Sequence, residues 1–240
     1  MLAKSRGPDG RMLALTGKKE LALTQQDWKE SMLCDTCEHR LKTKYEDFLN
    51  EVFYLRRSKK PIFSGLHRVL LWGDTDRFAL ALISIFWRGA VALRREFREV
   101  FAPPYVLEDM RQWIHSGRIS WDWGRLITIR VQEIRDAQGD TIAFLAPPFI
   151  RQTEQQQFEF VLICGGYVLT FALPVLPDEI YSRSKAVKPH SRVIRIERLY
   201  FREIREIGQH ADEMLAAPMP EKLRQAIASR SGRRIGRTRG

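Results

Sequence analysis

Two cysteines, Cys34 and Cys37, are the residues of this chain whose type and spacing are best suited to chemistry. They stand three positions apart where a helix is expected to begin, in the segment Leu-Cys-Asp-Thr-Cys-Glu-His-Arg-Leu-Lys. A turn of this kind points both sulfurs at one metal ion, and structural zinc takes four ligands in a tetrahedron. The pair therefore indicates half of a zinc site, with His39 as a weaker further candidate.

The other half of such a site is not evident in the sequence. Residues 1–33 contain neither Cys nor His, and the third cysteine, Cys164, lies far downstream in an apolar run. We therefore expect zinc at low occupancy, below one ion per chain. The alternative is a pair of reduced thiols, because a helix start lowers the pKa of a thiol and permits a redox role. The strand-then-helix pattern of thioredoxin-like proteins does not surround the pair.

The segment 33–42 resembles the second zinc-binding half of HNH nucleases and other treble-clef domains, in which Leu-Cys-x-x-Cys opens a helix. The flanking Lys-Glu-Ser-Met-Leu-Cys and Tyr-Glu-Asp-Phe, and the later Phe86-Trp87-Arg88, are similar to uncharacterised bacterial proteins with an HNH-like front end. The resemblance implies an upstream Cys-x-x-Cys and a His followed closely by Pro, and residues 1–33 contain neither. This predicts a degenerate or truncated, non-catalytic relative with no catalytic residue. A metal-dependent endonuclease is the alternative if an upstream N-terminal segment is missing.

The charge of the chain indicates an anionic partner. In 240 residues, 40 Lys and Arg stand against 29 Asp and Glu, which gives a net charge of +11. Residues 230–240 contain three glycines and no acid, and this composition predicts a disordered tail. We expect non-specific, electrostatic association with nucleic acid, and the alternative is a protein-interaction module with incidental positive charge. The tail would contribute five arginines: Arg230, Arg233, Arg234, Arg237 and Arg239.

Two further features have both a structural and a functional interpretation. Arg88 lies in the apolar stretch 78–93, where an unpaired guanidinium would be costly. We expect a carboxylate or carbonyl partner for it, and the alternative is an anion-binding role. Trp121 and Trp123 precede an expected strand, where they either close the edge of the core or stack on bases.

The elements expected to position these residues form an α+β fold. Apolar spacing of three and four predicts helices at about 38–56 and 75–98, the second capped by Asp74 or Thr75. The chain should thus have a helical N-terminal half containing the half zinc knuckle (Cys34 and Cys37), followed by an antiparallel sheet and C-terminal helices. The remaining expected helices are 105–115, 198–215 and 221–228, and the expected strands are 11–15, 125–134, 141–149, 158–164, 167–173 and a short one at 193–196.

The expected organisation has three parts. Residues 1–60 would be the knuckle and helix remnant of an HNH-like region, 61–229 an α+β domain, and 230–240 the basic tail. Three cysteines are too few for a disulfide framework, which favours a reducing cytoplasm. The apolar stretches 78–93 and 160–176 are broken by Arg88, by a Gly-Gly pair and by Pro174, so no membrane span is expected.

Overall fold

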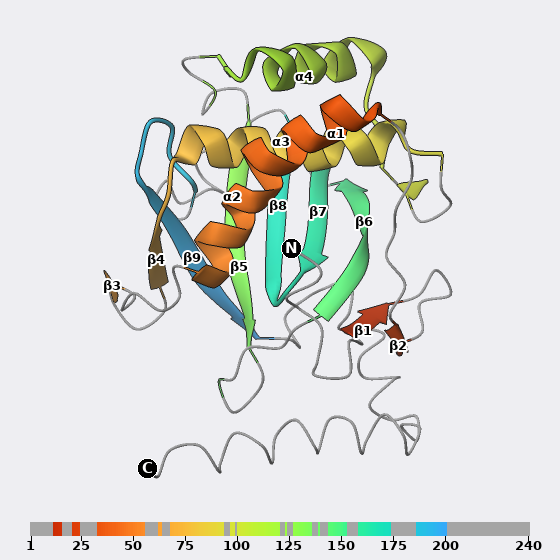
Figure 1. The fold of residues 1–240 in the computed structure, drawn as a ribbon. Coiled ribbons are helices and arrows are strands. Elements are labelled where there is room, and N and C mark those ends of the chain that lie inside the picture. Colours follow the sequence, from red (N-terminus) through yellow and green to blue (C-terminus); the bar gives the residue numbers. More distant parts are fainter. Residues whose placement is uncertain are drawn as a thin grey trace.

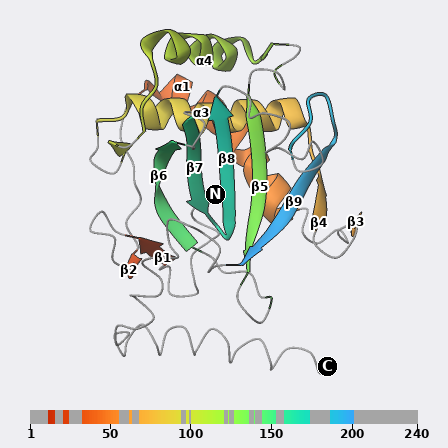
Figure 2. The same ribbon diagram turned by 180° about the vertical axis from the view of Figure 1, so that it is seen from behind.

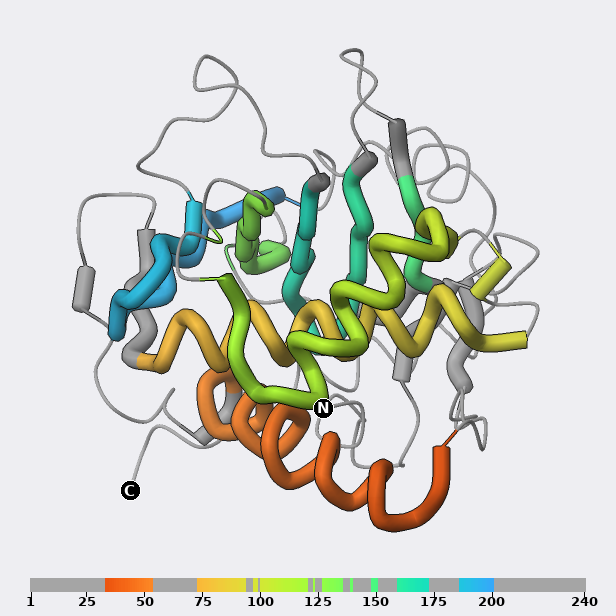
Figure 3. The backbone as a smooth tube through the Cα atoms, turned by 90° about the horizontal axis from the view of Figure 1, so that it is seen from above, coloured from red at the N-terminus to blue at the C-terminus, as the bar shows by residue number. Residues whose placement is uncertain are grey.

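The fold is described from a computed structural model, which describes residues 12–15, 21–24, 33–55, 62–63, 68–93, 97–98, 100–120, 123, 127–135, 139, 144–152, 158–173 and 186–200. It is an α+β arrangement in which helices cover one face of a nine-stranded mixed sheet (Figure 1). Seen from above, the helix of residues 75–91 lies between the strands and the helical run of residues 35–55, and the helix of residues 104–116 crosses above it (Figure 3). No helix among the described residues is long and apolar enough to cross a membrane.

The helices lie in the first half of the described chain, as the sequence predicts. A continuous helical run consists of α1 (Asp35–Leu41), the π-helical η2 (Lys42–Glu46), α2 (Asp47–Asn50) and the π-helical η3 (Glu51–Leu55). It is followed by α3 (Thr75–Val91) and α4 (Pro104–Ser116). The predicted apolar face of the run is the buried one, and it consists of Leu41, Tyr45, Phe48, Leu49, Val52 and Phe53.

Helix α3 begins where the sequence predicts and ends earlier. The Asp74 side chain caps it by accepting hydrogen bonds from the amides of Asp76 and Arg77, each at 3.0 Å. The helix ends at Val91, because Ala92 takes an extended conformation and the chain turns back, so the predicted extension to residue 98 is wrong. Val100 then packs against Gly89, because a Cβ added to this glycine would lie 3.4 Å from the Val100 Cγ1.

Strands from both halves of the chain build the sheet, whose order is β2-β1-β6-β7-β8-β5-β9-β4-β3. The predicted strand at 11–15 is present, whereas β2, β3 and β4 were not predicted. The bounds are β1 (Met12–Leu15), β2 (Leu21–Thr24), β3 (Ile62–Phe63), β4 (Arg68–Trp72), β5 (Thr128–Arg135), β6 (Phe144–Gln152), β7 (Phe158–Cys164), β8 (Tyr167–Leu173) and β9 (Val193–Tyr200).

The sheet departs from the prediction in two places. It is mixed rather than antiparallel, because β9 runs parallel to β5 and β1 runs parallel to β6. The helix predicted from residue 198 is wrong at its start, because β9 continues to Tyr200 and pairs Arg198 with Glu133 and Tyr200 with Arg135. The rest of that predicted helix, and the one at 221–228, lie outside the described residues.

Strand β6 contains two consecutive prolines, Pro147 and Pro148. A proline has no N–H to donate to a neighbouring strand. The register with β7 accordingly shifts between Ala146 and Phe149, which marks a bulge at this point.

Aromatic contacts join the helices to the sheet. The Phe86 ring lies 4.7 Å from that of Phe160 and 5.6 Å from that of Phe171. The Phe53 ring lies 4.4 Å from that of Tyr167, so the core spans the boundary expected near residue 60. Side chains on the opposite face of the central strands, such as Val161 and Ile163, are buried as well, although no described helix lies on that face (Figure 2).

Candidate functional site

Cys34 and Cys37 stand at the exposed start of the helical run. Cys34 occupies the N-cap position in an extended conformation, and its carbonyl oxygen accepts the first helical hydrogen bond from the Glu38 amide at 3.0 Å. Both thiols are free and exposed. Sulfur thus stands where a serine, threonine or aspartate oxygen usually caps a helix.

The two thiols differ in acidity because their surroundings differ. The backbone amide of Cys37, the Cys37 thiol and the Thr36 amide stabilise the thiolate of Cys34, so its pKa is lowered. The pKa of Cys37 is raised, chiefly because it donates a hydrogen bond to Cys34 and lies beside that negative charge, while Arg40 opposes the shift. Burial raises the pKa of Cys164 to about 12. Cys34 is therefore the thiol best placed to react as a thiolate.

The described residues do not complete a zinc site. No three His, Cys, Asp or Glu side chains among them come together in a group that could hold a metal. His39 is exposed and forms no such group with the two thiols. Because tetrahedral zinc needs four ligands, this part of the chain provides only half of the donor set.

A second candidate feature is a group of cations beside the cysteines, which no local pattern in the sequence indicated. Cys37, Arg40 and Lys44 follow one another at spacings of three and four along the helical run. The Arg40 guanidinium donates a hydrogen bond to the His115 carbonyl at the end of α4. Arg77, at the start of α3, donates from Nε to the Lys44 carbonyl at 2.7 Å. We call Arg40, Lys44 and Arg77 the basic cluster.

Gly117 makes room for the basic cluster. It ends α4 in the left-handed conformation, with φ of 69°, which a residue with a side chain rarely adopts. A Cβ at this position would lie 3.0 Å from the Lys44 Nζ. The absence of a side chain at Gly117 therefore leaves space for the Lys44 ammonium beside the end of α4, where His115 presents its carbonyl to Arg40.

The charge of the basic cluster is not neutralised by acids within the described part of the chain. Arg40 and Arg77 donate to backbone carbonyls there, and Arg77 also lies over the face of the Phe48 ring at 4.6 Å. No carboxylate forms an ion pair with any of the three cations among the residues that the structure describes. A carbonyl carries only a partial charge, so with respect to the described residues alone these exposed cations keep a positive charge.

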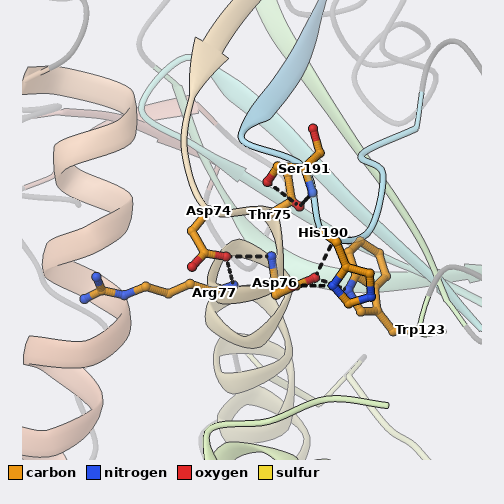
Figure 4. A network of polar contacts seen from close by, with 7 residues as sticks. All are labelled: Asp74, Thr75, Asp76, Arg77, Trp123, His190 and Ser191. Carbon is orange, nitrogen blue, oxygen red and sulfur yellow. Dashed lines mark hydrogen bonds and ion pairs between the residues drawn. The ribbon is translucent and has the colours of Figure 1, made fainter. Parts of the chain in front are cut away.

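A third feature is a clasp of polar contacts at the start of α3, formed by Asp76, Trp123 and His190 (Figure 4). Asp76 Oδ2 lies 2.7 Å from the Nδ1 of His190, and Asp76 Oδ1 accepts hydrogen bonds from the Trp123 indole N–H at 2.6 Å and the His190 amide at 3.1 Å. His190 has a left-handed backbone, with φ of 53°. Two residues far from Asp76 in the sequence, Trp123 and His190, thus converge on its carboxylate.

The clasp continues through Thr75 and Ser191. The Thr75 hydroxyl donates to the Ser191 carbonyl and accepts from the Ser191 amide, both at 2.9 Å. The Ser191 hydroxyl accepts from the Val193 amide at 3.1 Å. Both hydroxyls are therefore engaged with the backbone and neither is placed as a nucleophile beside His190, so the geometry favours a structural role.

The charge state of Asp76 follows from these contacts. Partial burial raises its pKa, but the hydrogen bonds from Trp123 and His190 outweigh burial, and the pKa of Asp76 is lowered. Trp123 is fully buried, which agrees with its interpretation as a residue that closes the core and not as a platform for bases. Trp121 lies outside the described residues.

Arg88 has carboxylate partners on the neighbouring helical run. Its guanidinium donates to Glu46 Oε1 at 2.6 Å, and Glu38 Oε2 lies 3.7 Å away. The Arg88 side chain is only 17% exposed, so these ions balance a charge that would otherwise be buried unpaired. The arginines of the tail, from Arg230 onward, lie outside the described residues.

Comparison of the chain with protein-family models, with curated proteins and with solved structures gave no match.

Proposed function

We propose that this protein is a non-catalytic, degenerate or truncated HNH-like protein of the cytoplasm that associates with nucleic acid through its basic segments. The observation that carries the proposal is the basic cluster, in which Arg40 and Arg77 donate to backbone carbonyls and Lys44 Nζ lies beside Gly117. None of the three forms an ion pair with a carboxylate of the described chain. Cations that acids already neutralise contribute little to binding a polyanion. These three retain their charge for a phosphate backbone.

The chemistry of the cluster favours binding without sequence preference. Arginine and lysine contact phosphate oxygens, and each contact releases condensed counterions from the nucleic acid. Base-specific recognition instead needs side chains that reach base edges in a groove. The net charge of +11 and the five arginines of residues 230–240 add to the same electrostatic attraction.

Fluorescence anisotropy with random duplex and single-stranded oligonucleotides across a salt series tests the proposal. The intact chain should bind with an affinity that falls linearly with salt on a log–log plot. The double variant Arg40→Gln with Lys44→Gln should bind more weakly, and its slope on duplex DNA should be shallower by about 0.9 for every phosphate that it no longer neutralises. Deletion of residues 230–240 should reduce the slope independently.

A matched control removes two charges elsewhere. Arg111, which is paired with Glu108 at 2.7 Å, and Lys188, which is exposed, are both replaced by glutamine. This control should bind like the parent chain, and thermal melting should show that both double variants are folded. Equally weakened binding in the two double variants would assign binding to net charge alone, and no binding at low salt would refute the proposal.

A second candidate function, a protein-interaction module, is favoured by the corner between α3 and α4. Three large apolar side chains are exposed there, namely Leu93 at 89%, Tyr105 at 71% and Phe101 at 57%. Exposed apolar side chains gathered in one place often mark contact surfaces. A chain that fails to bind any oligonucleotide would favour this alternative.

A further inference from the structure

We propose that Cys34 and Cys37 form a redox-active dithiol that exchanges with a soluble disulfide of the glutathione type. This goes beyond association with nucleic acid and depends on neither the basic tail nor a metal. The pair stands at the exposed start of the helical run, one turn apart. Cys34 is the N-cap and Cys37 the third residue of the helix, so both thiols belong to the same turn.

The positions of the two sulfurs determine which thiol attacks the disulfide and which resolves the intermediate. Cys34 is the N-cap, next to the free amides of the first turn, and these amides favour negative charge on its sulfur. Cys37 lies inside the first turn and holds its proton toward Cys34. Cys34 is thus the attacking thiol and Cys37 the resolving one, and the buried Cys164 takes no part.

The reaction balances as an ordinary thiol–disulfide exchange. The Cys34 thiolate attacks one sulfur of glutathione disulfide, the reagent's S–S bond breaks, and one glutathione leaves as its thiolate. Cys37 then loses its proton to solvent and attacks the Cys34 sulfur, which releases the second glutathione. The dithiol is oxidised by two electrons, and one disulfide is reduced to two thiols.

The neighbouring charges suit an anionic disulfide. Arg40 lies close enough to Cys37 to affect its acidity, and Lys44 follows one turn further along the run. Glutathione carries two carboxylates in each half, so these cations attract it. Glu38 acts in the opposite direction at Cys37 but lies 3.7 Å from Arg88, which offsets its charge.

Intact-mass measurement tests the dithiol in the full chain. The reduced protein, held in chelator, is incubated with mixtures of reduced and oxidised glutathione. The parent chain should lose two hydrogen atoms and retain no glutathione. The ratio of oxidised to reduced glutathione at which half of the protein is oxidised should lie within the range of these mixtures. The Cys37→Ser variant should instead retain one glutathione on Cys34, because no resolving thiol is present.

Three comparisons complete the test. Cys34→Ser should react with glutathione disulfide at least about tenfold more slowly than Cys37→Ser, since thiolate character governs the attack. Cys164→Ala should behave like the parent chain. The proposal is overturned if the parent retains glutathione, if it does not oxidise within the glutathione range, or if the two single variants react equally fast. A full equivalent of zinc in the purified parent, absent from Cys34→Ser, would also overturn it by assigning the pair to a metal.

Discussion

Helices α1 and α3 begin with different capping chemistry. At α3 the Asp74 carboxylate accepts two amide hydrogen bonds, and Asp76 holds Trp123 and His190 in place. At α1 the N-cap is Cys34, which is exposed and whose side chain makes no capping hydrogen bond. The first start is satisfied by oxygen ligands and is structural, whereas the second leaves a polarised thiol in solvent.

One backbone feature thus serves two purposes in the two helices. The free amides at the start of a helix favour negative charge in either case. Where a carboxylate supplies that charge permanently, the result is stability. Where an ionisable thiol supplies it, the same amides shift a titration, and the result is reactivity.

The largest expected effect is at the α3 clasp. Asp76→Ala should lower the free energy of unfolding by about 2–3 kcal/mol, because the charged acceptor is removed and the indole N–H of Trp123 is left without a partner. Urea unfolding at pH 7 measures this. Asp76→Asn should cost less, since it keeps an oxygen for Trp123. A decrease below about 0.5 kcal/mol for the alanine variant would mean that the clasp is not structural.

The clasp should also weaken in acid. The pKa of Asp76 is lower in the folded chain than its ordinary value of 3.8, so its contribution is complete above that value and is lost as the pH falls through the folded one. The unfolding free energies of the parent and of Asp76→Asn should therefore still differ at about pH 5 and converge toward about pH 3. His190 is the titratable group that faces this carboxylate. A difference that stayed flat to about pH 3 would show that folding does not shift Asp76.

Removal of the α3 cap should have a smaller effect. Asp74→Ala should destabilise the protein by about 1 kcal/mol, because the amides of Asp76 and Arg77 lose their shared acceptor. Asp74→Ser provides the control, since a hydroxyl can still cap the helix and should recover most of the stability. Equal destabilisation by the two changes would point to the charge of Asp74 rather than to capping.

The smallest effect should appear at α1, and its sign should be reversed. Cys34→Ser places an oxygen at the N-cap and should leave stability unchanged or raise it by up to about 0.5 kcal/mol, while it removes the reactive thiol. Cys37→Ser should be neutral within about 0.5 kcal/mol, because the side chain is exposed. Thermal and urea unfolding measure both changes. Destabilisation above about 1 kcal/mol by Cys34→Ser would show that the sulfur itself holds the structure together.

Local patterns accounted for most of the helices and for the central hairpin. Apolar residues from Leu41 to Phe53 recur at helical spacing, and the structure buries those side chains. Strands β7 and β8 flank the Gly165-Gly166 turn, so short-range chemistry was enough to predict them. Strand β4 was missed and β9 was predicted too short because β9 pairs with both β4 and β5, which lie far from it in the sequence.

The candidate sites also differ in whether the sequence alone could reveal them. The Cys34 and Cys37 pair could be identified from sequence because it lies within one helical turn. Neither the basic cluster nor the clasp could be identified, since Arg40 reaches a carbonyl 75 positions away and Asp76 reaches a histidine 114 positions away. The charges of Arg40, Lys44 and Arg77 were visible in the sequence, but the absence of acidic partners in the described chain was not.

The sequence by itself determined the paired thiols, the excess of positive charge, the apolar face of the first helical run and the Asp74 cap. Apart from the overall charge, each depends on residues within a few positions of one another, where backbone geometry fixes the distance. The tertiary structure decided that Arg88 meets Glu46, that Trp123 and His190 share one carboxylate, and that β9 joins β5 in parallel. These depend on which distant segments pack together, and packing is set by the burial of the whole core rather than by any local pattern.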